Sequence, residues 1–175
     1  MEEESKVEKN MKKAAQLLFF RRHRLPGVRG WELKRAIGGD WLEVIKLLNL
    51  ELERLGIEVK QISETGEENE EDPEGARFVA LLKTPLPPKA TGRRIDDIAI
   101  LSATLAFLIS KQGKASKKEI EELLSEKFPR WRVGPSIDRY LKDGYLGEDE
   151  KMIYIGWRTR AEVDKKTLLD LILAS

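Results

Sequence analysis

Few side chains in this sequence are of the types that carry out catalysis. The chain has no cysteine, and His23 is its one histidine, set among three arginines and a proline. A zinc site, a cysteine nucleophile or a serine–histidine–aspartate triad therefore has no complete set of residues. The glycine-rich phosphate loops and the metalloprotease and nucleophile-elbow motifs are also absent. The sequence predicts a protein that is not an enzyme and that needs no cofactor or metal.

Paired carboxylates and paired glycines have structural explanations. Asp96-Asp97 and Glu121-Glu122 lie where helices are expected to begin or on exposed helix faces, and acidic residues are favoured there. The glycine pair at 38–39 follows a short helical pattern and is typical of a helix end.

Basic residues are stronger candidates for binding, and they gather around the third helix expected in the second half of the chain. Helix-turn-helix proteins place such residues against DNA phosphates, while a few side chains of the third helix reach base edges. The candidate DNA-binding residues are Arg130, Arg132, Arg139, Lys142, Arg93, Arg94, Lys114, Lys117 and Lys118. Acidic residues such as Asp138 and Glu148 are interspersed, so a solvated charged surface is the other interpretation. Any binding to double-stranded DNA is expected to be weak and independent of sequence.

A run of four large apolar residues near the start, Leu17, Leu18, Phe19 and Phe20, exceeds what one helix face buries in a small domain. Some of them are therefore candidates for contact with a protein partner. The alternative is that they are shared between a domain core and a contact between domains. The residue pattern alone leaves both interpretations open.

Composition predicts a soluble, intracellular protein. The 175 residues are 41% hydrophobic and 36% charged, with a net charge of +1. No apolar segment approaches the roughly 20 residues that a membrane span requires, and the acidic N-terminal residues do not fit a signal peptide. The lack of cysteine favours a reducing compartment, and the abundance of lysine and glutamate resembles thermophile proteins. We expect a cytoplasmic location and no membrane partner.

The first half of the chain has the pattern of three helices followed by two strands. Helices are expected at residues 7–24, 31–37 and 41–55, the last opened by a capping box at Asp40. Apolar alternation then predicts two strands, at residues 57–62 and 77–82, joined by an acidic loop. Three helices and a hairpin make a winged-helix plan.

Three prolines and a glycine in residues 84–92 predict an extended linker. After it, Asp96 or Asp97 is expected to cap a nearly continuous apolar helix at 98–111, whose pattern favours burial on several sides. The Ser-Lys-Lys-Glu run that begins at Ser116 has the spacing of a capping box and predicts the start of the next helix.

The third helix and the wing of this second domain are expected next. Pro135 suits the first position of a helix, and Gly144 suits the left-handed residue that ends it. Strands at 145–146 and 152–155 flank a turn of sequence Gly-Glu-Asp-Glu. A final apolar helix is expected after a cap at Asp164.

These patterns define a mainly α fold with small β-hairpins, in the α+β class, built as two tandem winged-helix domains. We expect a first domain at residues 1–83, a proline-rich linker at 84–95 and a second domain with a C-terminal helix at 96–175. The two halves share hardly any residue identity, so the plan is repeated although the sequence is not.

Five stretches, which together span most of the chain, match the pattern of a known family. They are AAQLLFFRRHR, LGIEVKQI, RFVALLKTPLPP, AILSATLAFLISKQGKASKKEIEELL and YIGWRTRAEVDKKTLLDLIL. In these stretches the sequence resembles the melanoma antigen (MAGE) homology domain and its relatives the kite proteins, tandem winged-helix subunits of structural-maintenance-of-chromosomes (SMC) complexes. Gly156, Arg158 and Glu162 fall on the family pattern, whereas Ile155 and Trp157 stand where the family has tryptophan and proline. These departures indicate a distant prokaryotic or archaeal relative.

The resemblance implies a non-enzymatic subunit that binds a kleisin, the bridging protein of such complexes, or an adjacent winged-helix or RING-type protein. It also implies weak contact with DNA and a role in chromosome segregation or DNA repair, in association with the nucleoid. If Leu17 and Leu18 match the di-leucine of the family, they are partner contacts.

A second hypothesis is a winged-helix transcription regulator that binds a specific DNA site as a homodimer. It requires base-reading arginine, asparagine or glutamine side chains on the third helix. The segment from Pro135 to Asp143 offers mainly Arg139.

Overall fold

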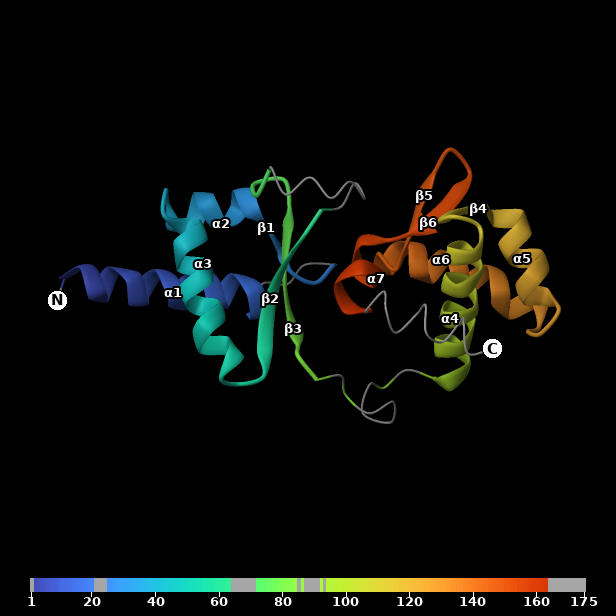
Figure 1. Cartoon of the computed structure of the whole chain (residues 1–175), viewed down its shortest axis with the longest axis horizontal. Helices are drawn as coiled ribbons and strands as arrows, with labels where there is room; N and C mark the ends of the chain where they lie inside the picture. Colours follow the sequence, from blue (N-terminus) through green and yellow to red (C-terminus); the bar gives the residue numbers. More distant parts are fainter. Residues whose placement is uncertain are drawn as a thin grey trace. The chain divides into compact units, whose positions relative to one another are not determined.

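The structure is a computed structural model that describes residues 2–20, 25–63, 72–84, 86, 92 and 94–163. Its elements are helices and small antiparallel sheets, as predicted (Figure 1). The chain divides into two compact units, Met1–Pro85 and Leu86–Ser175, here called unit 1 and unit 2. The division falls inside the proline-rich segment. Among the described residues, no helix has both the length and the apolar character that a membrane span requires.

Unit 1 contains three helices and a three-stranded antiparallel sheet. Its elements, in chain order, are α1 (Glu2–Phe20), β1 (Val28–Arg29), α2 (Gly30–Ile37), α3 (Trp41–Glu53), β2 (Ile57–Ile62) and β3 (Arg77–Leu82). The strand order is β1-β3-β2, so the last strand lies in the middle of the sheet. The predicted strands β2 and β3 are confirmed at both ends.

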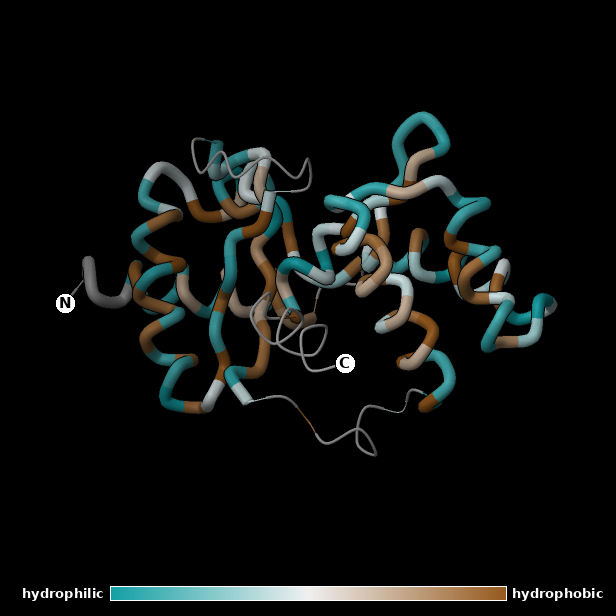
Figure 2. Tube along the Cα trace, turned by 45° about the vertical axis from the view of Figure 1, so that its right-hand side comes forward, coloured by the Kyte–Doolittle hydropathy of each residue, from teal (hydrophilic) through white to brown (hydrophobic). Residues whose placement is uncertain are grey.

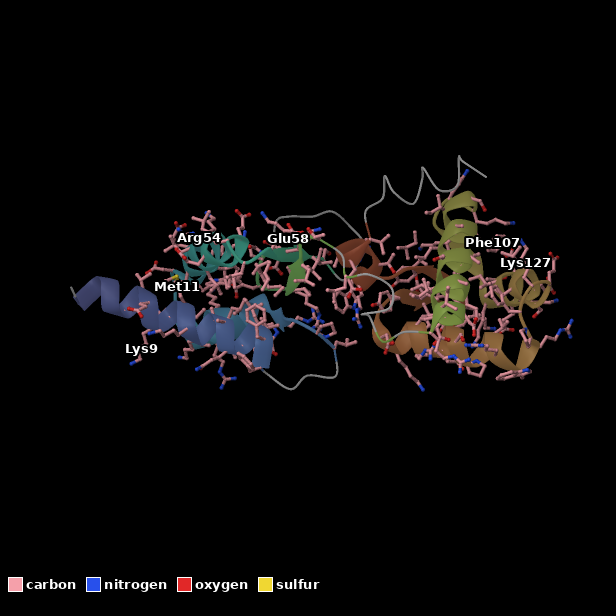
Figure 3. The ribbon with its side chains drawn as sticks, turned by 90° about the horizontal axis from the view of Figure 1, so that it is seen from below. Lys9, Met11, Arg54, Glu58, Phe107 and Lys127 are labelled. Atoms are coloured by element: carbon pink, nitrogen blue, oxygen red, sulfur yellow. The ribbon has the colours of Figure 1, made fainter. Side chains whose placement is uncertain are left out.

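The core of unit 1 lies between its helices and one face of this sheet. Leu33, Trp41 and Phe78 are buried there, and the Trp41 and Phe78 rings meet edge-on with 5.3 Å between their centroids. Met11 lies on the side of α1 that packs against this core, whereas Lys9 lies on the opposite side (Figure 3). The apolar periodicity of α1 therefore matches the face that it buries.

Unit 2 repeats this order of elements and adds one short helix. Its elements are α4 (Ile95–Ser110), β4 (Lys114–Ser116), α5 (Lys117–Ser125), α6 (Arg130–Asp143), β5 (Leu146–Asp149), β6 (Met152–Ile155) and α7 (Trp157–Glu162). The strand order β4-β6-β5 again places the last strand in the middle. The predicted winged-helix plan is confirmed in both units. The short strands β1 and β4 were not predicted, because two or three residues are too few to show an alternating pattern.

The core of unit 2 forms where α4, α5 and α6 meet the sheet. Ile100, Leu108, Ile137 and Ile153 have no solvent exposure. Figure 2 shows the contrast between the largely apolar α4 and the hydrophilic tip of the β5–β6 hairpin. Residues that flank the buried stripe of α4, such as Phe107, are partly buried against the same core, so this helix is covered over a broad part of its surface.

The third helix of unit 2 begins earlier than predicted. α6 starts at Arg130, so Pro135 lies inside the helix, and the prediction that it opens the helix is wrong. An interior proline removes a backbone hydrogen bond. Val133 explains the earlier start: it lies one turn before Ile137 and is 1% exposed in the core, which requires helical geometry before the proline. Gly144 ends α6 with a φ of 82°, as predicted.

The turn of the second wing lies later than predicted. Glu150 and Lys151 form it, with φ angles of 47° and 77°, whereas Gly147 lies within β5. A Cβ atom at Gly147 would come within 2.3 Å of the Tyr154 ring on the paired strand. Gly147 therefore leaves room for the Tyr154 ring, and the prediction that Gly147 belongs to the turn is wrong.

The capping box of α5 is confirmed. The Ser116 hydroxyl accepts a hydrogen bond from the Glu119 backbone N–H at 3.3 Å, and the Glu119 carboxylate accepts one from the Ser116 N–H at 2.9 Å. The Ser116 hydroxyl also donates to the Glu119 carboxylate at 2.7 Å, and this bond is the main cause that lowers the pKa of Glu119 to about 2; the bonds from the Ser116 N–H and the Lys111 ammonium add to the shift.

Other helix starts differ from prediction in their first residue or in their cap. Asp40 precedes α3 but its side chain makes no capping hydrogen bond. α4 begins directly after Arg94, so Asp96 and Asp97 lie inside its first turn and do not cap it. α1 begins at residue 2, five residues before the predicted start. The cap expected at Asp164 lies outside the described residues.

Candidate DNA and partner surfaces

Three of the predicted DNA-binding arginines meet two carboxylates at the start of α4. A guanidinium nitrogen of Arg132 lies 2.7 Å from a carboxylate oxygen of Asp96, and another lies 3.4 Å from Asp97. Arg139, two turns further along α6, lies 2.9 Å from Asp97. Arg94 lies 3.6 Å from Asp96. These five residues are called the arginine–aspartate cluster below, and they join the first turn of α4 to α6.

The electrostatics of this cluster favour the ionised groups. The pKa of Asp97 lies below its ordinary value, chiefly because Arg139 donates a hydrogen bond to it; partial burial opposes the shift, and the charges of Arg139 and Arg132 add to it. The same hydrogen bond raises the pKa of Arg139. The Tyr140 hydroxyl also donates to the backbone carbonyl of Asp97. Three guanidinium groups face two carboxylates, so the cluster retains one positive charge.

Two predicted lysines are also paired within unit 2. The Lys117 ammonium lies 2.8 Å from the Asp138 carboxylate on α6, and this hydrogen bond raises the pKa of Lys117. Lys118 lies 3.8 Å from Glu122, one helical turn away, in a largely exposed pair. Asp138 was expected to dilute the positive potential of this region, and the structure shows that it does so through an individual ion pair.

Three of the predicted basic residues, Arg130, Lys142 and Lys114, form no ion pair within the described part of the chain. Arg130 and Lys142 are exposed on α6. The Lys114 ammonium lies 5.8 Å from the centroid of the Tyr154 ring. Arg93 lies outside the described residues. These three cations can meet a phosphate without breaking an ion pair.

The structure divides the four residues of the predicted partner surface. Leu18 is 8% exposed and belongs to the core of unit 1, and Leu17 is partly buried against that core. Phe19 and Phe20 are 40% and 79% exposed, with 6.4 Å between their ring centroids. The accessible part is therefore the phenylalanine pair at the end of α1. His23, which follows it in the sequence, lies outside the described residues.

Trp131 is an exposed residue that the sequence reasoning missed. It lies in the first turn of α6 with 76% of its surface exposed, directly after Arg130. The signal was present in the sequence: a helix that begins before Pro135 places Val133 and Ile137 on the buried face and Trp131 away from it. Placing the helix start at the proline concealed this exposed aromatic side chain.

The residues that matched the family pattern in the tail form one cluster behind the second wing. Arg158 lies 2.5 Å from the Glu162 carboxylate, and its guanidinium carbon lies 4.5 Å from the centroid of the Tyr145 ring. The Tyr145 hydroxyl donates to the other Glu162 oxygen at 2.7 Å. A Cβ at Gly156 would come within 2.3 Å of the Gly144 carbonyl oxygen, so the chain passes too closely there for a larger residue.

Both units have the arrangement that defines a winged helix. Three helices precede a β-hairpin, and the second hairpin strand also pairs with a short strand between the first two helices. The chain is therefore a tandem winged-helix protein. Within the described residues, no group of histidine, cysteine, aspartate and glutamate side chains is arranged to hold a metal ion.

Comparison with known proteins gives a likeness of fold. No protein-family model matches the sequence, and no curated protein matches it. Among solved structures, the fold is similar to that of a chain in the Nse1-Nse3-Nse4 complex, with a TM-score of 0.67. The match covers 97% of this chain and 90% of that chain at 15% sequence identity. At this identity the comparison establishes the shared fold.

Proposed function

We propose that this chain is a non-enzymatic subunit of the kite or MAGE type, which binds a kleisin or a winged-helix partner within an SMC-type complex for chromosome maintenance or DNA repair. The observation that carries the proposal is the tandem winged-helix fold, shared along nearly the whole chain with a chain from the Nse1-Nse3-Nse4 complex. The cluster of Gly156, Arg158 and Glu162 adds support, since these residues follow the family pattern. This function would locate the chain in the cytoplasm, at the nucleoid.

The phenylalanine pair at the end of α1 is the proposed partner contact. A partner that covers an exposed aromatic side chain buries a large apolar surface. Aromatic residues are also frequent among the residues that dominate binding energy. Leu17 and Leu18 support this surface from the core side. Leu18 therefore acts on the partner indirectly, by fixing the end of the helix.

The proposed DNA contact is electrostatic. Arg130, Lys142 and Lys114, which have no ion-pair partner among the described residues, supply positive charge, and phosphate contacts carry little sequence information. The alternative of a site-specific regulator has less support, because Arg139, the main base-reading candidate on α6, is paired with Asp97.

Co-purification tests the partner assignment. The full chain would be co-expressed with each kleisin and tandem winged-helix protein encoded in the same genome, and complexes would be separated by size-exclusion chromatography. We expect one stable complex, which Phe19→Ser with Phe20→Ser abolishes. The matched control is Leu50→Ser with Leu55→Ser, two leucines of unit 1 that are 59% and 73% exposed.

The possible results separate the two parts of the proposal. If no candidate forms a complex with the native chain, the subunit assignment fails. If a complex forms and the phenylalanine variant still joins it, the assignment stands and the partner surface lies elsewhere. If the leucine control is equally defective, the phenylalanine pair has no specific role.

A further inference from the structure

The arginine–aspartate cluster contains arginines that differ in how far solvent and DNA can reach them. Arg94 and Arg139 have side chains that are 74% and 46% exposed, so solvent and ligands reach them. Their carboxylate partners lie in the first turn of α4. Arg132 is 20% exposed, lies between both carboxylates and holds the two helices together. The cluster therefore contains one structural arginine and two accessible ones.

A carboxylate and a phosphate compete for the same feature of arginine. Both accept hydrogen bonds from its planar guanidinium group. The ion pair between Arg94 and Asp96 is largely exposed and contributes little net free energy, so exchanging Asp96 for a phosphate oxygen costs little there. The cost of DNA contact lies elsewhere: a duplex laid on Arg94 and Arg139 brings its phosphates close to two fixed negative charges.

The neighbouring charges make this repulsion decisive. Arg130 lies in the same first turn of α6 as Arg132 and has no ion-pair partner among the described residues. With both aspartates neutral, Arg94, Arg130, Arg132 and Arg139 would form a group of four uncompensated cations. With both ionised, half of that charge is cancelled. The low pKa of Asp97 shows that its cancelling charge is present at neutral pH.

We propose that Asp96 and Asp97 mask this arginine group, and that they keep the affinity of unit 2 for double-stranded DNA low by placing two negative charges beside the guanidinium groups that phosphates would contact. The inference rests on the proposed DNA binding and names the surface responsible for it. Strong DNA binding by unit 2 then requires that the two carboxylates be neutralised or moved away from α6.

Charge-neutral replacements test the mask. Asp96→Asn with Asp97→Asn removes both negative charges and keeps an oxygen that can accept from Arg132. Binding of a fluorescently labelled duplex would be measured by anisotropy over a salt series. Two freed arginines steepen the dependence of log affinity on log salt by about two, and we expect about tenfold tighter binding at low salt.

Two further variants separate a mask from a general charge effect. Glu126→Gln with Asp149→Asn changes the net charge equally and removes two exposed carboxylates of unit 2 that make no ion pair among the described residues. It should leave the salt dependence nearly unchanged. Adding Arg139→Gln to the double asparagine variant should reverse about half of its gain.

The outcomes decide the inference. The mask is overturned if DNA affinity rises equally in the double asparagine variant and in its charge-matched control. It is also overturned if the double asparagine variant binds DNA with the affinity of the native chain; in that case the proposed weak DNA binding still stands. If neither the native chain nor any variant binds DNA at low salt, both the mask and the DNA part of the proposed function fail, whereas the co-purification result is unaffected. If the double variant does not fold, Asp96→Asn alone decides, because its carboxylate is 42% exposed; we expect about threefold tighter binding.

Discussion

The hydroxyl of Tyr145 donates a hydrogen bond of 2.7 Å to the carboxylate of Glu162, and this bond joins the residue before β5 to the end of α7. Tyr145 is 5% exposed, and its ring also lies against the Arg158 guanidinium. Removing the hydroxyl leaves the ring packed but removes one hydrogen bond to a charged group. We expect Tyr145→Phe to lower the free energy of unfolding by about 1.5–3 kcal/mol.

Urea unfolding followed by circular dichroism would measure this loss. Tyr154→Phe is the matched control, because the Tyr154 hydroxyl makes no hydrogen bond within the described part of the chain, and it should change stability by less than about 0.5 kcal/mol. Equal effects of the two substitutions would show that the bond to Glu162 is not a stabilising feature.

The capping box of α5 should make part of the stability depend on pH. The pKa of Glu119 falls from an ordinary value of 4.5 to about 2 in the folded protein. A carboxyl with a depressed pKa stabilises the fold fully above its unfolded pKa and loses that contribution as pH falls through the folded pKa. The contribution of Glu119 is therefore complete above about pH 5 and is lost towards about pH 2.

Glu119→Gln isolates this effect, because glutamine can still complete a capping box but cannot ionise. Unfolding by urea would be measured from pH 7 downwards. The difference between the native chain and the variant should be largest near neutral pH and should shrink below about pH 4. Glu126→Gln, an exposed control after the same helix, should show no such convergence. A constant difference at all pH values would contradict the low pKa.

The end of α1 should separate stability from binding. Leu18→Ala removes core side-chain volume and should lower the free energy of unfolding by about 2–4 kcal/mol. Phe20→Ala removes a side chain that is 79% exposed and should change it by less than about 1 kcal/mol. Urea unfolding of both variants provides the measurement. A large loss in Phe20→Ala would mean that this ring supports the fold and is a poor candidate for a partner contact.

DNA binding by the native chain should be weak, independent of sequence and steeply dependent on salt. Arg130→Gln with Lys142→Gln removes two cations of α6 that form no ion pair with any described residue, and it should reduce the salt slope by about two. Lys46→Gln with Arg54→Gln is a charge-matched control in unit 1, where both cations have glutamate partners. Anisotropy titrations of two unrelated duplexes give both the slope and the sequence dependence. An equal loss in the control would assign binding to net charge alone.

Local rules predicted the elements whose determinants lie close together in the sequence. The Ser116 capping box, the glycine that ends α6 and the strand pair 57–62 and 77–82 each depend on residues a few positions apart, and each is confirmed. The tandem winged-helix plan followed from their order. Such features are decided by backbone geometry and side-chain periodicity, which a single sequence displays.

Several errors come from residues whose partners lie far away in the sequence. Asp96 and Asp97 are of a residue type that often caps helices. In the structure they instead accept hydrogen bonds from an arginine that follows 35 or more residues later. Pro135 has the character of a helix start, yet the burial of Val133 extends the helix past it. Pairings of this kind depend on the tertiary fold, so a local pattern cannot reveal which cations of the candidate site are already neutralised.

The strand order has a consequence for how the chain is made. In both sheets the central strand, β3 or β6, is the last of the three to leave the ribosome. Until it emerges, the two earlier strands of that sheet have no backbone partner, because each pairs with the central strand alone. Each sheet is thus completed in a single late step during synthesis, and a chain interrupted before residue 152 would leave β4 and β5 as unpaired edges open to aggregation.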